Sequence, residues 1–167
     1  MPVCLCCSIL YTVTMENGPE KFISPRGILR SKILTGQISP TDFLAKIRDF
    51  DQMQSDRGDS SQNIKLLTDT EVQEIFMGSE HEVVYSAELS QAYFHSGQIY
   101  EMSGGEGLTF FKNALTASKR ADDEVWTNYC AATVAYLESN QLELNKLAQT
   151  QTGNEVLVCT SVLLLKD

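Results

Sequence analysis

Apolar side chains recur at intervals of three and four over most of this chain, the spacing that gathers them on one side of an α-helix. The longest such stripe comprises Tyr85, Leu89, Ala92, Tyr93, Ser96 and Tyr100. Similar stripes precede and follow it, around Phe43 to Met53, Leu108 to Ser118, Val125 to Tyr136 and Leu144 to Ala148. The pattern predicts an all-α fold of antiparallel helical hairpins.

Start and stop signals divide the pattern into separate helices. Ser24-Pro25 and Ser39-Pro40 each offer an N-cap followed by proline in the first helical position, and the first helix is expected to run to Leu34 and stop at Gly36. Thr68 or Asp69 can cap a short helix that ends near Gly78. Glycines 104 and 105 end the long helix, a second helix follows around Leu108 to Ser118, the acidic run at 122–124 caps a third, and Gly153 ends the last.

The organisation we expect is one globular domain in four parts. Residues 1–18 form an apolar extended arm or short strand, unless Met15 is the natural start and this arm is a non-native extension. Residues 19–53 form an N-terminal helical hairpin, 54–63 a polar loop or linker, and 64–167 a repeat-like helical domain.

A short internal sequence repeat lies in the second half of the chain. Residues 97–104 return 36 positions later as 133–140, and Tyr93 and Tyr129 precede the two copies at the same offset. This arrangement resembles the tetratricopeptide repeats over roughly residues 85–151. In that family an aromatic opens the first helix, a small residue four places on admits the second helix, another aromatic follows, and glycine or asparagine turns the chain. These places hold Tyr93, Gly97, Tyr100 and Gly104, then Tyr129, Thr133, Tyr136 and Asn140.

The resemblance implies a surface that binds a peptide or a partner helix. In the first copy it would be lined by Gln91, Phe94, His95, Gln98, Glu101 and Met102. In the second it would be lined by Thr127, Cys130, Ala131, Val134 and Glu138. The lysine and asparagine set with which some family members clamp a terminal carboxylate is missing from these positions. The alternatives are an unrelated helical bundle, or two copies that pack together without leaving a groove.

Charge and cysteine content narrow the partners and the setting. A net charge of -9 repels nucleic acid and anionic lipid, and the apolar run at 2–13 is too short to span a bilayer. Three of the five cysteines crowd at Cys4, Cys6 and Cys7, which suits no disulfide framework. We therefore expect a cytoplasmic protein that binds a protein or peptide, not nucleic acid or membrane.

Chemical motifs are sparse. A zinc site at the three clustered cysteines would need His81 or His95 to complete it, and we expect no metal and no cofactor. Cys130, His95 and Glu101 could form the site of a small helical enzyme or ligand-binding domain, which is the alternative to a non-catalytic scaffold or adaptor.

The segment 155–165 is almost wholly apolar and requires cover. As a helix or a strand, it could pack within the chain or join two copies into a homo-oligomer.

Overall fold

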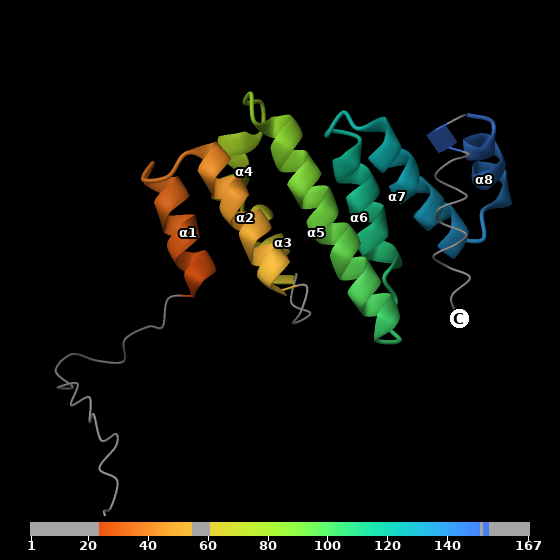
Figure 1. The fold of residues 1–167 in the computed structure, drawn as a ribbon, viewed down its shortest axis with the longest axis horizontal. Helices are drawn as coiled ribbons and strands as arrows, with labels where there is room; N and C mark the ends of the chain where they lie inside the picture. Colours follow the sequence, from red (N-terminus) through yellow and green to blue (C-terminus); the bar gives the residue numbers. More distant parts are fainter. Residues whose placement is uncertain (1–23, 55–60, 151, 154–167) are drawn as a thin grey trace, which may run out of the picture.

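A computed structural model of the chain describes residues 24–54, 61–150 and 152–153. All regular structure in these ranges is helical, which confirms the all-α class. The helices are α1 (Pro25–Leu34), α2 (Pro40–Gln54), α3 (Ser61–Leu67), α4 (Thr70–Phe76), α5 (Glu82–Met102), α6 (Leu108–Ser118), α7 (Glu124–Leu137) and α8 (Gln141–Ala148). They stand in a row with α5 near its middle (Figure 1). The predicted arm at 1–18, the centre of the predicted loop and the apolar segment 155–165 lie outside the described residues.

Local capping sets most helix starts where the sequence predicts them. The Ser24 hydroxyl accepts a hydrogen bond from the Gly27 amide at 3.1 Å, and the Asp69 carboxylate accepts one from the Val72 amide at 3.3 Å. Asp123 caps α7 in the same way. Gly36 and Gly78 follow α1 and α4 with positive φ angles of 67° and 74°, a conformation that favours glycine.

The predicted loop over 54–63 is wrong at both ends. Gln54 is the last residue of α2, and residues 61–63 open α3. Asn63 is fully buried in α3, and its side-chain oxygen accepts a hydrogen bond from Arg26 Nε of α1 at 2.7 Å. Because this contact comes from a distant helix, the polar composition of the segment gave no sign of it.

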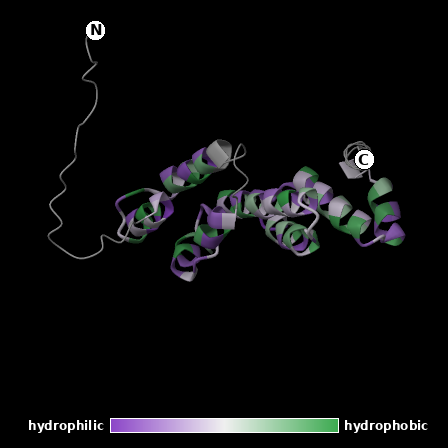
Figure 2. Ribbon diagram, turned by 90° about the horizontal axis from the view of Figure 1, so that it is seen from below, coloured by the Kyte–Doolittle hydropathy of each residue, from purple (hydrophilic) through white to green (hydrophobic). Residues whose placement is uncertain are grey.

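One apolar core joins α1 to α4 with the first half of α5, a region we call the N-terminal bundle. The Phe76 ring stacks on the Tyr85 ring with centroids 4.7 Å apart, and Phe43 lies 5.6 Å from Phe76. The Tyr85 hydroxyl donates a hydrogen bond to the Leu67 carbonyl. Figure 2 shows hydrophobic and hydrophilic residues alternating along the ribbons, as one-sided burial of helices requires.

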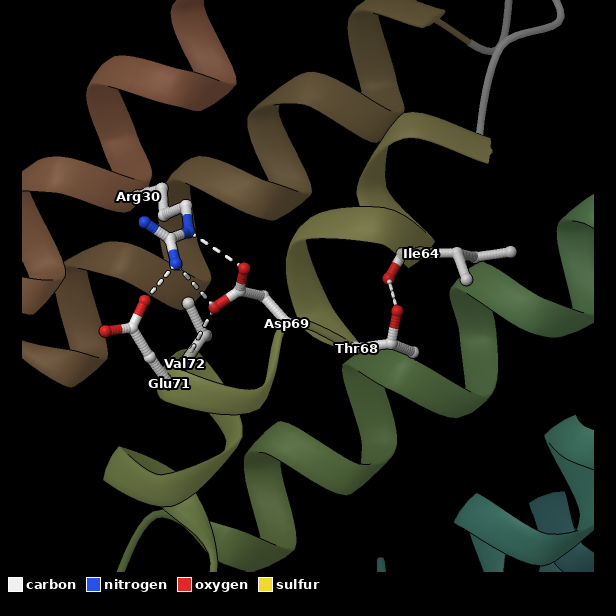
Figure 3. A network of polar contacts seen from close by, with 6 residues as sticks. All are labelled: Arg30, Ile64, Thr68, Asp69, Glu71 and Val72. Atoms are coloured by element: carbon white, nitrogen blue, oxygen red, sulfur yellow. Dashed lines mark hydrogen bonds and ion pairs between the residues drawn. The ribbon is translucent and has the colours of Figure 1, made fainter.

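Arginines fasten the helices of this bundle to one another. Arg30 of α1 donates to the Asp69 carboxylate at 2.8 and 3.1 Å and also contacts Glu71 (Figure 3). These hydrogen bonds lower the pKa of Asp69 below its usual value. Arg48 of α2 donates to Glu88 of α5, whose side chain is 4% exposed. Each arginine thus reaches across to a different helix.

A second core joins the last half of α5 to α6 and α7, and α8 packs on α7 through a separate small cluster; we call this region the C-terminal array. Each of these helices packs against the next in chain order. Gly97 of α5 lies so close to α6 that an added Cβ would come within 2.8 Å of the Phe111 ring. Phe111 is 3% exposed and meets Phe94 edge to face at 4.9 Å. A small residue at position 97 is therefore required by the packing of α5 on α6.

The two copies of the internal repeat have similar solvent exposure at equivalent positions, but their turns differ. Tyr100 and Tyr136 are 46% and 48% exposed, and Gly97 and Thr133 are both buried. The predicted turn holds for Gly104, with a φ of 77°, but is wrong for Asn140: Ser139 takes the positive φ of 53°. Asn140 instead caps α8 by accepting a hydrogen bond from the Glu143 amide at 3.2 Å. The connection from α7 to α8 is short, so its third residue must already start the next helix.

Candidate protein-interaction surface

Four residues on one side of α5 are exposed to solvent at intervals along the helix. Val84, Gln91, Gln98 and Met102 follow spacings of seven, seven and four, which places them on one stripe of the helix. Val84 is 41% exposed and Met102 is 89% exposed. Gln91 and Gln98 are exposed between them, and their side chains make no hydrogen bond within the described residues. We call these four residues the α5 stripe.

Two further predicted residues of α5 border this stripe. His95 is half-buried at its edge. Glu101 is exposed, and its Oε1 accepts a hydrogen bond from the Gly107 amide at 2.6 Å. A Cβ at Gly107 would lie 2.5 Å from the Gly97 carbonyl oxygen, so the chain passes very close to α5 here. Glu101 therefore helps to hold the turn between α5 and α6.

Phe94 lies in the core and not on the solvent side of α5. Its side chain is 5% exposed. Its ring centroid is 5.0 Å from that of Trp126 and 5.2 Å from that of Tyr129, both on α7. Cys130 and Val134 of α7 belong to the same buried cluster. Phe94, Cys130 and Val134 were all predicted to line the surface. The structure brings them together, but in the buried packing between helices.

The remaining predicted residues of α7 stay within reach of solvent. Thr127 and Ala131 are half-buried. Glu138 follows the end of α7 and forms an ion pair with Lys112 of α6 at 2.5 Å. A partner that contacts Glu138 would therefore meet a carboxylate already paired with a cation.

The alternative site is not assembled as a reactive centre in this fold. Cys130 is fully buried, and burial raises the pKa of its thiol to about 12. At neutral pH this thiol stays protonated, whereas a nucleophilic cysteine needs the thiolate. Within the described ranges, no hydrogen bond or ion pair joins Cys130 to His95 or Glu101, and Glu101 instead accepts a hydrogen bond from the Gly107 amide.

A pair of buried hydrogen bonds at Ser90, which the sequence did not reveal, connects α5 to α6 and α7. Ser90 Oγ donates a hydrogen bond to the Ala114 carbonyl of α6 at 2.8 Å and accepts one from Trp126 Nε1 of α7 at 2.8 Å. Ser90 and Trp126 are 36 residues apart and so hold the same place in the two copies. The 36-residue spacing can be read from the sequence, but serine and tryptophan are too different for the two positions to be recognised as equivalent.

Comparisons with protein-family models, with curated proteins and with solved structures found no match. Among the described helices, none combines the length and the apolar character needed to cross a membrane. The described histidine, cysteine and acidic side chains form no group of three or more that could hold a metal ion.

Proposed function

We propose that this chain is a non-catalytic interaction or scaffold protein that binds a peptide or a helix along the α5 stripe. The observation that carries the proposal is the exposure of Met102, which is 89% exposed at one end of the α5 stripe, together with the exposed Gln91, Gln98 and Val84 along it. Methionine adapts its shape to an apolar partner, and exposed apolar side chains arranged together are typical of interaction sites.

The chemistry of the stripe favours a partner with both apolar and hydrogen-bonding groups. The amides of Gln91 and Gln98 can each donate and accept, while Val84 and Met102 offer apolar contacts at the two ends. Residues 82–153 carry nine acidic and four basic side chains. A peptide or helix that combines apolar residues with a basic one would complement this surface.

Selection of displayed random peptides on the purified full chain tests the proposal. We expect peptides to be enriched and their affinity to fall at least about tenfold for Met102→Asp, because a charge replaces the most exposed apolar contact. Met77→Asp is the matched control, since Met77 is an exposed methionine before the opposite end of α5. Enriched peptides that bind Met102→Asp as tightly as the control, or no enrichment at all, would overturn the proposal.

A further inference from the structure

Three of the side chains that the structure describes carry sulfur, and they differ widely in exposure. Met102 is 89% exposed and Met77 is 39% exposed. Cys130 is fully buried, and its raised pKa keeps the thiol protonated. An oxidant must reach the sulfur atom that it oxidises, and for cysteine it also requires the thiolate. Among these three side chains, Met102 is therefore the one that an oxidant in solution attacks first.

The end of α5 is held by contacts that do not involve the Met102 side chain. Ser103 Oγ donates hydrogen bonds to the carbonyl oxygens of Ile99 and Tyr100 at 2.7 and 3.1 Å. The Gly105 amide donates one to the Tyr100 carbonyl at 2.8 Å. None of the apolar clusters formed by the described residues includes Met102. A chemical change at its sulfur should therefore leave the fold intact.

Such a change would instead alter the α5 stripe, where Met102 is the most exposed apolar side chain. The thioether of methionine is flexible and apolar, whereas its sulfoxide is polar and chiral. The sulfoxide oxygen accepts hydrogen bonds from water. Burying it against an apolar partner that offers no donor costs free energy. Oxidation at this position should therefore weaken binding without unfolding the protein.

We propose that Met102 is a reversible oxidation site, and that its oxidation by hydrogen peroxide switches off binding at the α5 stripe. The inference rests on the proposed function, because it requires a partner that contacts this stripe. One peroxide oxygen forms an S–O bond at Met102 Sδ as the O–O bond breaks, and it gives its proton to the other oxygen, which leaves as water. The sulfur loses two electrons and the peroxide gains them. Methionine sulfoxide reductases reverse the step with two electrons from a thiol reductant, and the oxygen leaves as water.

Peptide mapping of the full chain during treatment with hydrogen peroxide tests the first step. We expect Met102 to become sulfoxide at least about twofold faster than Met77, in line with the exposure of the two side chains. Met77 is the matched control, because one sample reports both rates. Oxidation of Met77 as fast as that of Met102 would overturn the proposal.

Binding of an enriched peptide that lacks methionine and cysteine tests the second step, after the peroxide has been removed. We expect the affinity of the wild type to fall at least about tenfold on oxidation and to return after treatment with sulfoxide reductases and dithiothreitol. Met102→Leu removes the sulfur, so the affinity of this variant should be the same before and after peroxide, whatever its starting value. Met77→Leu should lose affinity as the wild type does.

The outcomes separate this inference from the proposed function. Oxidised wild type that keeps its affinity, or an equal loss in Met102→Leu, would overturn the oxidation site and leave the proposed function standing. Failure to enrich any peptide would overturn the proposed function and this inference with it.

Protection by the peptide supplies a further measurement. Because binding and oxidation at Met102 oppose each other, saturating peptide should slow the oxidation of Met102 and leave that of Met77 unchanged. Equal rates for Met102 with and without peptide would contradict the proposal.

Discussion

The N-terminal bundle and the C-terminal array hold their helices together in different ways. In the bundle, long side chains reach across the spaces between helices, as Arg30 does to Asp69 and Arg48 does to Glu88. In the array, small residues let the helices approach, as Gly97 does for Phe111 and as Ser90 does for Trp126. Close packing around a glycine leaves the helices of the array little room to shift.

The largest loss of stability should come from adding a side chain at Gly97, where α5 packs closely on α6. Gly97→Val adds a branched side chain at a position where even a single added Cβ would lie 2.8 Å from the Phe111 ring. We expect this substitution to lower the free energy of unfolding by about 3 kcal/mol. Urea unfolding measures the loss, and hydrogen exchange should rise in α6 and α7 more than in α1 to α4.

Two variants control this prediction. Adding Phe111→Leu to Gly97→Val should restore part of the stability, because the smaller side chain makes room. Ala45→Val, at an exposed position of α2, should cost less than about 1 kcal/mol. A Gly97→Val protein as stable as the Ala45→Val protein would show that the array does not depend on close approach.

The bundle should respond most to loss of the cation beside its buried carboxylate. Arg48→Met leaves Glu88 without that charge, and we expect a loss of about 2 kcal/mol, below the full cost of a buried pair because Arg48 is itself half exposed. Glu88→Gln in the same protein should recover part of the loss. Lys46→Met is the control, since Lys46 pairs with the exposed Asp49. Equal unfolding midpoints for Arg48→Met and Lys46→Met would contradict the role of this pair.

Alkaline pH should destabilise both regions, through Cys130 in the array and through Tyr85 in the bundle. The pKa of the Cys130 thiol is about 12 in the folded chain against 9.0 as its ordinary value, so stability is complete below pH 9 and falls as the pH rises toward 12. We expect a loss of about 1 kcal/mol by pH 10, measured by urea unfolding at each pH. Burial likewise raises the pKa of Tyr85 in the bundle to about 12, which adds a loss above pH 10.

Cys130→Ala separates the two contributions. Its stability should decline much less than that of wild type between pH 9 and 10, even though the substitution lowers stability at every pH. An unchanged slope over this range would mean that Cys130 is not the group that titrates.

The smallest effect should come from the half-buried ion pair between Arg30 and Asp69 in the bundle. Asp69→Asn keeps a side chain that can cap α4 but removes the charge beside Arg30, and we expect a loss of about 0.5 kcal/mol at neutral pH. The pKa of Asp69 is lowered in the folded chain, so the pair stabilises above about pH 4 and its contribution is lost as the pH falls further. The difference between wild type and Asp69→Asn should therefore vanish in acid, and a difference that persists there would exclude the ion pair as its source.

Local signals in the sequence predicted the helices well, because caps act within a few residues. Ser24 and Asp69 start helices by bonding amides three positions on, and Gly36 needs only its own conformational freedom to end one. The helix α3 escaped prediction because Asn63 is held by Arg26, 37 residues away. Tertiary contacts of this kind leave no local trace.

The candidate surface was predictable only in part. The resemblance to a repeat family predicted that Gln91, Gln98 and Met102 line a surface, and they do face solvent. The resemblance also placed Phe94 on that surface, but Trp126 and Tyr129 cover it, because its exposure depends on how α7 lies against α5. The binding role of the α5 stripe stays a prediction.

The helix α5 passes from one core to the other without a break. Tyr85 and Leu89 belong to the bundle, Phe94 belongs to the array, and Tyr93 packs against both. One residue inserted between Leu89 and Phe94 would turn everything beyond it by about 100° relative to the bundle, whereas an insertion of about seven would nearly restore the facing. The length of this one helix therefore limits which insertions and deletions the chain can accept during its evolution.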